Sequence, residues 1–209
     1  MRMSPRVALV IIGAVFFLPL ALAWLMYTGK IEFRPVETRN RGELVQPLVP
    51  VSWDGVTGVG RPDEAAGQAA FEPTHLEGHW TVLHALPAHC DSACEAHATE
   101  LRQVHRASGR QMGRIRLVLL QPAADPSMAA ELRRIYPRFE IATDTGGSLE
   151  AALERVAQEY GTTAGPVGST YLIDPLGNIM MYYEAGSDPN DLKSDLKRLL
   201  TWSKLDEQS

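Results

Sequence analysis

The chain has 209 residues, of which 45% are hydrophobic, and it carries a net charge of -5 and two cysteines. This length accommodates one domain of ordinary size with an additional segment, and the apolar content can supply its core. The charge leaves no basic footprint for nucleic acid, so nucleic-acid binding is excluded as a function class. Two cysteines are too few for a disulfide scaffold or a four-cysteine zinc site. They indicate a redox dithiol, a metal-binding pair or a plain structural disulfide.

An apolar segment without charge runs from Val7 to Tyr27. Its length is close to the roughly 20 residues that a membrane-spanning helix needs, and Arg2 and Arg6 precede it, which predicts a cytoplasmic N-terminus. A cleaved signal peptide, with Ala21-Leu22-Ala23 as the cleavage pattern, is the alternative. Because the apolar run continues past that pattern, we expect an uncleaved, single-pass anchor in the inner membrane over residues 1–30. Either interpretation exports the rest of the chain to the periplasm, an oxidising compartment.

Residues 31–78 are rich in Pro, Gly and charge, which predicts a linker with one or two short strands. From residue 79 onward, apolar runs alternate with helical patterns. This alternation predicts an α/β domain over residues 79–209, in which helices flank a central mixed sheet. We expect strands at Trp80–Leu86, Ile115–Leu120, Phe139–Ala142, Thr170–Asp174 and Ile179–Tyr183, and helices at Asp91–Ser108, Pro126–Tyr136, Ser148–Tyr160 and Pro189–Trp202.

Both cysteines lie at the junction between the first strand of this domain and the helix that follows. The strand breaks at Pro87, and Cys90 and Cys94 stand four residues apart at the predicted helix start. Backbone N–H groups and the helix dipole favour a thiolate there. At positions i and i+4 the side chains would share one helix face, near the outer limit of disulfide geometry, so we expect a strained and reducible bond. Cys90 is the predicted attacking thiol, and Cys94 would resolve the mixed disulfide.

Two thiolates also suit Cu(I), and nearby histidines could supply a third donor. His97 is three residues after Cys94 on the same predicted helix face, so the candidate metal ligands are Cys90, Cys94 and His97. His84 and His89 could serve in its place. The alternative for each histidine is structural: His97 at the core edge, His84 in a strand and His89 in a turn. The remaining histidines are expected to face solvent: His75, His79 and His105.

The order of the elements, with a two-cysteine motif at the end of the first core strand, resembles the thioredoxin-like fold. The C-x-x-x-C spacing of Cys90 and Cys94 and the segment Tyr171-Leu172-Ile173-Asp174-Pro175-Leu176-Gly177 resemble the Sco/SenC family. Members of that family are membrane-anchored proteins that help to assemble the copper site of cytochrome c oxidase. Gly165-Pro166 resembles the proline-containing loop that faces the cysteines in thioredoxin-like folds; an ordinary turn is the alternative.

One position departs from the Sco pattern. That family places a copper-ligand histidine five residues before the tyrosine, where this chain has Pro166, and no histidine follows His105. The third ligand of the Sco site is therefore missing. The resemblance still implies cytochrome c oxidase subunits or copper chaperones as partners, and copper as the candidate metal.

Three functions follow from these residues. We expect thiol–disulfide exchange through Cys90 and Cys94, which would keep a copper-site partner or an oxidase subunit reduced during assembly. A Cu(I)-binding chaperone that uses both cysteines and a histidine is one alternative, and a docking factor with an inert disulfide is the other. A peroxidase is disfavoured, because Pro87 stands where such enzymes place a threonine.

Overall fold

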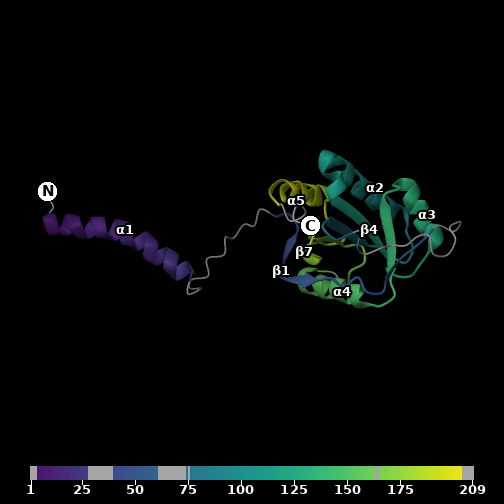
Figure 1. Ribbon diagram of the computed structural model, residues 1–209, viewed down its shortest axis with the longest axis horizontal. Coiled ribbons are helices and arrows are strands. Elements are labelled where there is room, and N and C mark those ends of the chain that lie inside the picture. Colours follow the sequence, from purple (N-terminus) through teal and green to yellow (C-terminus); the bar gives the residue numbers. More distant parts are fainter. Residues whose placement is uncertain (1–3, 28–39, 61–73, 75, 163–164, 204–209) are drawn as a thin grey trace. The chain divides into compact units, whose positions relative to one another are not determined.

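The computed structural model describes residues 4–27, 40–60, 74, 76–162 and 165–203, and the chain divides into two units, Met1–Arg39 and Asn40–Ser209. The first unit contains the helix α1 (Pro5–Tyr27), drawn in purple in Figure 1. Large apolar side chains are exposed along it, from Val7 to Trp24. In the described part of the chain, no helix has both the length and the apolar character that a membrane crossing requires.

The second unit is built on a seven-stranded mixed sheet with the order β1-β7-β6-β3-β4-β5-β2. Three parallel strands lie side by side in it: β3 (Trp80–Ala85), β4 (Ile115–Gln121) and β5 (Phe139–Asp144). On the other side of β3, β6 (Thr170–Ile173) and β7 (Asn178–Tyr183) form an antiparallel hairpin. The strands expected after residue 79 are thus confirmed, and so is the mixed sheet.

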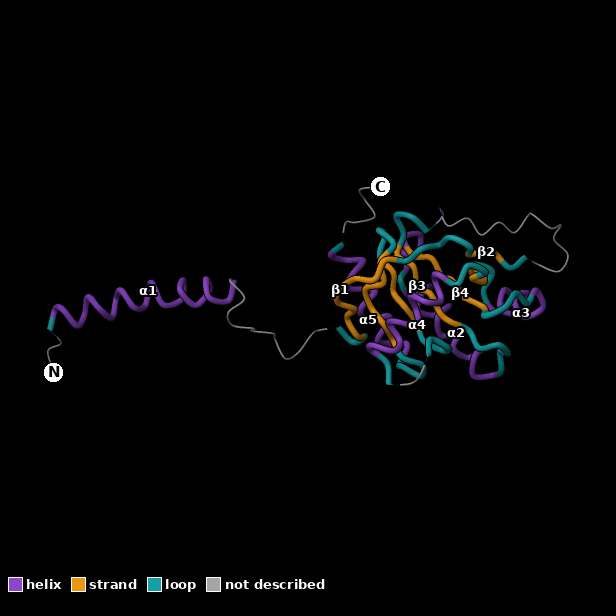
Figure 2. The backbone as a smooth tube through the Cα atoms, turned by 90° about the horizontal axis from the view of Figure 1, so that it is seen from below, coloured by secondary structure: helices purple, strands orange, loops and turns teal. Residues whose placement is uncertain are grey.

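The two edge strands come from the residues before this core. β1 (Glu43–Pro50) pairs antiparallel with β7, and β2 (Val56–Gly58) pairs antiparallel with β5. Figure 2 shows them on opposite sides of the domain. The hydroxyl of Tyr160 accepts a hydrogen bond from the Gln46 N–H and donates one to the Gln46 carbonyl, both at 2.9 Å. The Tyr160 side chain thereby provides hydrogen-bond partners for backbone N–H and C=O groups in the irregular middle of β1.

Helices cover both faces of the sheet (Figure 1). The helices α2 (Ser92–Ala107), α3 (Pro126–Ile135) and α5 (Pro189–Trp202) pack their apolar residues in one cluster with one face of the sheet. The opposite face packs against α4 (Ser148–Tyr160) in a second cluster. A short 3₁₀ helix, η2 (Gly109–Arg114), connects α2 to β4. Buried apolar clusters on both faces of the sheet confirm an α/β domain with helices on both sides of a central sheet.

The carboxylate of Asp195 on α5 binds the chain where it enters the domain. This side chain is 1% exposed, and its Oδ2 accepts hydrogen bonds from the N–H groups of Arg41 at 2.8 Å and Gly42 at 2.9 Å. The hydroxyl of Tyr183 donates a third at 3.2 Å, and Arg198 forms an ion pair with Oδ1 at 3.6 Å. The Tyr183 ring also lies against Gly42, where a Cβ atom would come within 2.5 Å of it.

One histidine expected to face solvent is buried. His105 is 3% exposed, because it follows Leu101 by one turn on the core side of α2. Its Nδ1 lies 2.8 Å from the hydroxyl of Tyr136, and its Nε2 lies 3.1 Å from the Met112 carbonyl oxygen. The expectation of solvent exposure is therefore wrong for His105. His79 is half-buried, and His75 lies outside the described residues.

Candidate functional site

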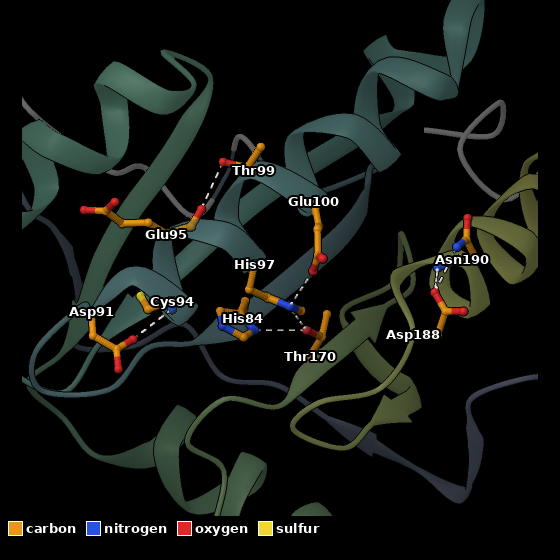
Figure 3. Close-up of polar contacts among 10 residues, drawn as sticks. All are labelled: His84, Asp91, Cys94, Glu95, His97, Thr99, Glu100, Thr170, Asp188 and Asn190. Atoms are coloured by element: carbon orange, nitrogen blue, oxygen red, sulfur yellow. Dashed lines mark hydrogen bonds and ion pairs between the residues drawn. The ribbon is translucent and has the colours of Figure 1, made fainter.

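The two cysteines form a disulfide at the start of α2. Asp91 is the N-cap of this helix, and its carboxylate accepts hydrogen bonds from the N–H groups of Ala93 and Cys94. Figure 3 shows the bond between Asp91 and Cys94. Cys90 therefore precedes the helix, whereas Cys94 lies in its first turn, with their Cα atoms 5.2 Å apart. The expectation that both cysteines share a helix face is wrong, because the helix begins only after its aspartate cap.

The two cysteines differ in exposure. Cys94 is 8% exposed and packs in the core cluster, whereas Cys90 is half-buried. Cys90 is thus the cysteine that a partner's sulfur can approach more easily. The dipole of α2 favours negative charge at this position.

Two stacked histidines lie near the disulfide. His84 of β3 and His97 of α2 have ring centroids 4.3 Å apart. The hydroxyl of Thr170 on β6 lies between their ring nitrogens, 3.0 Å from His84 Nδ1 and 3.4 Å from His97 Nε2. On its other side, His97 Nδ1 lies 3.4 Å from Glu100 Oε2 (Figure 3). Three elements of the core thus meet in one polar cluster of four side chains.

Burial keeps both imidazoles neutral. It lowers the pKa of His84 to about 3, with a further contribution from the neighbouring His97. Burial also lowers the pKa of His97, although the Glu100 carboxylate opposes this change. At neutral pH the pair therefore carries no positive charge, and its nitrogens act as neutral donors and acceptors of hydrogen bonds.

A cleft of about 600 Å³ brings Cys94 together with both histidines. Its apolar lining includes Val167, which is 55% exposed, and Pro189. Three carboxylates also line it: Asp91, Glu100 and Asp188. The disulfide therefore lies beside an open cleft, which is lined by the buried Cys94 and by three carboxylates.

The loop before β6 borders the same cleft. The N–H of Gly168 donates to the Ala85 carbonyl at 2.7 Å, and the Ala85 N–H donates to the Ser169 carbonyl at 3.1 Å. These bonds hold the loop, which includes Pro166, against the end of β3. The imidazoles at this cleft come from β3 and α2, and Pro166 stands where the Sco pattern has its histidine.

The predicted metal ligands are brought together only in part. Cys94 and His97 line the cleft, while Cys90 is bonded to Cys94 and the exposed His89 is not among the lining residues. Among the described residues, no three or more His, Cys, Asp or Glu side chains are placed to hold a metal ion. With the sulfurs bonded to each other, the residues in this arrangement do not fit a copper site.

Two members of the polar cluster were not predicted from the sequence. Glu100 follows His97 by three residues on α2, and that spacing is a signal for a contact on one helix face. Thr170 is 86 residues from His84, so no local pattern indicates their hydrogen bond.

Residues 80–203 match a family model described as the transmembrane-like, thioredoxin-like, C-terminal domain. No curated protein matches the sequence.

Solved structures with this fold include apo Sco1 of Thermus thermophilus, with 14% identity and a TM-score of 0.55 over 79% of this chain and 99% of that one. Copper-bound ScoI of Arabidopsis thaliana has 17% identity and a TM-score of 0.50 over 71% and 98% of the two chains. BsSco, a Sco-family cytochrome c oxidase assembly protein with a disulfide switch, has 13% identity and a TM-score of 0.50 over 78% and 98%. Similarities at this level of identity establish a shared fold. The chain belongs to the transmembrane-like, thioredoxin-like, C-terminal domain family, and its fold is the thioredoxin-like fold seen in Sco proteins.

Proposed function

We propose that this protein catalyses thiol–disulfide exchange through Cys90 and Cys94. The observation that carries the proposal is the disulfide itself, which lies at a helix N-terminus and beside an open cleft, with one half-buried and one buried cysteine. Cys90 is the more exposed of the two and is the proposed nucleophile, whereas the more buried Cys94 is the proposed resolving thiol.

In the proposed reaction, the reduced protein attacks a disulfide of its partner. The Cys90 thiolate bonds to one partner sulfur, and the other partner sulfur leaves as a thiolate and takes up a proton. Cys94 then loses its proton and attacks the Cys90 sulfur, which releases the second partner thiol. The partner disulfide has gained two electrons, and the protein has become the Cys90–Cys94 disulfide. A second dithiol protein is required to reduce it again.

The proposed partner is a protein of the cytochrome c oxidase copper site, either an oxidase subunit or a copper chaperone. The support comes from the Sco-like fold and from BsSco, which belongs to a family of cytochrome c oxidase assembly proteins. Copper sites with cysteine ligands bind metal only when their thiols are reduced. Reduction of such a dithiol is a reaction that Cys90 and Cys94 can perform.

We further propose that residues 1–30 anchor the protein in the inner membrane, with the folded unit of residues 40–209, which includes the edge strands β1 and β2, in the periplasm. The sequence supports this, because no charge occurs between Val7 and Tyr27 and two arginines precede them. Helix α1 also exposes large apolar side chains that need a nonaqueous environment, and the family description includes the word transmembrane-like.

The test is a trapping experiment with the reduced full-length chain and a model protein disulfide. Cys94→Ser should accumulate the mixed disulfide at Cys90, because the resolving thiol is gone, whereas Cys90→Ser should react at least about tenfold more slowly. Ala107→Ser adds a hydroxyl at an exposed position at the other end of the same helix and serves as the control. Equal reaction rates for Cys90→Ser and the unaltered chain would disprove the proposed role of Cys90.

A second candidate function is Cu(I) transfer, with the metal as cargo of the reduced protein. It is favoured by the placement of His97 and Cys94 in one cleft. The reduced chain should then bind one Cu(I) against a competing chelator, and either cysteine-to-serine change should abolish binding. His97→Ala should weaken it, whereas His79→Ala, a half-buried histidine that is not among the residues lining this cleft, should leave it unchanged. A docking factor with an inert disulfide predicts neither copper binding nor exchange.

A further inference from the structure

We propose that the partner segment recognised at this disulfide carries a lysine or arginine next to its reactive cysteine, and that Glu100 and Asp188 bind this basic side chain. The inference rests on the proposed exchange function, since it names the class of substrate that the same site accepts.

The first argument is the shape of the surface beside the disulfide. The cleft of about 600 Å³ and a neighbouring pocket of about 210 Å³ share Glu100, Asp188 and Pro189 as lining residues. Because they share these residues, the two hollows adjoin, and together they are called the groove here. Cys90 is bonded to Cys94, which lines the larger cleft, so a peptide joined to the Cys90 sulfur can place a neighbouring side chain beside these two carboxylates.

The second argument is the charge of the groove. Asp91, Glu100 and Asp188 line the larger cleft, and none of its lining residues, all within the described ranges, is lysine or arginine. His84 and His97 add no positive charge, because burial lowers the pKa of each. A basic residue is therefore favoured here over an acidic one, which the carboxylates would repel.

The three carboxylates are not equivalent. Asp91 and Asp188 cap the helices α2 and α5, so their carboxylates already accept hydrogen bonds from backbone N–H groups. Glu100 pairs with the neutral His97, and its side chain is 44% exposed. Glu100 is thus the stronger attractant for a cation. Lys193 lines the smaller pocket but not the larger cleft, so the favourable position for a cation is on the side of the larger cleft, beside Glu100.

The third argument is the apolar border, which suits a peptide. Val167 is 55% exposed, and Ala185 and Pro189 line the same cleft. Extended peptides bury backbone and aliphatic surface against such residues, while their charged termini remain in water. Small inorganic cations gain nothing from this apolar lining.

The experiment measures how fast the reduced full-length chain reacts with three short peptides. Each carries one cysteine as a mixed disulfide with thionitrobenzoate, and they differ only in the neighbouring residue, which is arginine, alanine or glutamate. Two electrons from the dithiol release one peptide thiol and one thionitrobenzoate, whose absorbance is followed. We expect the arginine peptide to react about threefold to tenfold faster than the glutamate peptide at low ionic strength, and the ratio to fall in high salt.

The variant is Glu100→Gln combined with Asp188→Asn, which preserves the capping ability of residue 188. It should bring the ratio of arginine to glutamate rates close to one. The control removes the same amount of charge elsewhere, with Glu95→Gln and Glu131→Gln; Figure 3 shows Glu95 pointing away from the histidine pair. Because the readout is a ratio between peptides, changes in the intrinsic reactivity of the thiols cancel.

The outcomes separate this inference from the function on which it rests. No reaction with any of the three peptides would overturn the exchange function itself. Equal rates for all three would overturn only the substrate preference. The preference for the arginine peptide could instead survive in the double variant, or be lost equally in the control variant. Either result would show that the preference comes from the net charge of -5 rather than from the groove.

Discussion

The imidazole rings of His84 and His97 lie 4.3 Å apart with their planes inclined by 31°, and they join the strand before the disulfide to the helix after it. Two protonated rings could not occupy this arrangement without strong repulsion. The packing of β3 against α2 beside the disulfide therefore depends on the neutral state of both histidines.

Acid should destabilise the protein through His84. Its pKa is about 3 in the folded chain, against an ordinary value of 6.5, so between these values only the unfolded chain takes up the proton. Above pH 6.5, His84 does not lower the free energy of unfolding. As the pH falls from 6.5 toward 3, that free energy decreases by about 1.4 kcal/mol per pH unit. Urea unfolding at pH 7 and pH 5 should differ by about 2 kcal/mol on this account.

In His84→Gln this part of the pH dependence should disappear, although the variant is less stable at pH 7. His89→Gln replaces an exposed imidazole and serves as the control. A pH dependence in His84→Gln as steep as in the unaltered chain would assign acid sensitivity to other groups.

Reduction of the disulfide should cost only a modest part of the stability. The bond closes a loop between residues four apart, and so short a loop restricts the unfolded chain by about 2 kcal/mol. We expect the urea midpoint to fall accordingly in dithiothreitol, with a cooperative transition in both states. Unfolding of the whole domain on reduction would be incompatible with a dithiol that cycles between its two states.

The Asp195→Ala variant should be about 2–4 kcal/mol less stable than the unaltered chain. The change removes a buried acceptor and leaves the N–H groups of Arg41 and Gly42 without it. Lys193→Ala, at an exposed position on the same helix, should change stability by less than about 0.5 kcal/mol. Thermal unfolding of the two variants side by side measures the difference, and equal stabilities would show that water replaces the carboxylate.

Gly42→Ala should also destabilise the domain, by about 1–3 kcal/mol, because the new methyl group would overlap the Tyr183 ring. Gly113→Ala is the matched control, since a Cβ atom there has no other atom within 4 Å. Chemical denaturation of both variants measures the difference between their free energies of unfolding. A Gly42→Ala variant as stable as Gly113→Ala would mean that Tyr183 moves aside freely.

The sequence predicts the core of the domain well because its signals are local. Helix α4 begins at Ser148 and ends before Gly161, and α5 runs from Pro189 to Trp202, in both cases as the pattern of apolar residues indicates. The cysteine pair at the junction of strand and helix is equally local. Aspartate is a preferred N-cap residue, so Asp91 indicates a helix start that leaves Cys90 outside the helix. The periodicity of the apolar residues alone includes Asp91 in the helix.

The parts that the sequence does not specify depend on partners far along the chain. β1 contains Pro47 and Pro50, and its place in the sheet depends on β7 and on Asp195, which is 153 residues from Gly42. Burial of His84 likewise depends on its contacts with α2 and with Thr170. No pattern within a short window contains this information.

Both edges of the sheet are formed by residues that precede Trp80, where the match to the family begins. A chain shortened to the matched region would leave β5 and β7 with unpaired rows of N–H and C=O groups. Such open edges are templates for strand addition between molecules. The native outer strand β1 carries two prolines, which cannot donate to a further strand. We therefore expect the residues before the family's domain to protect it against aggregation.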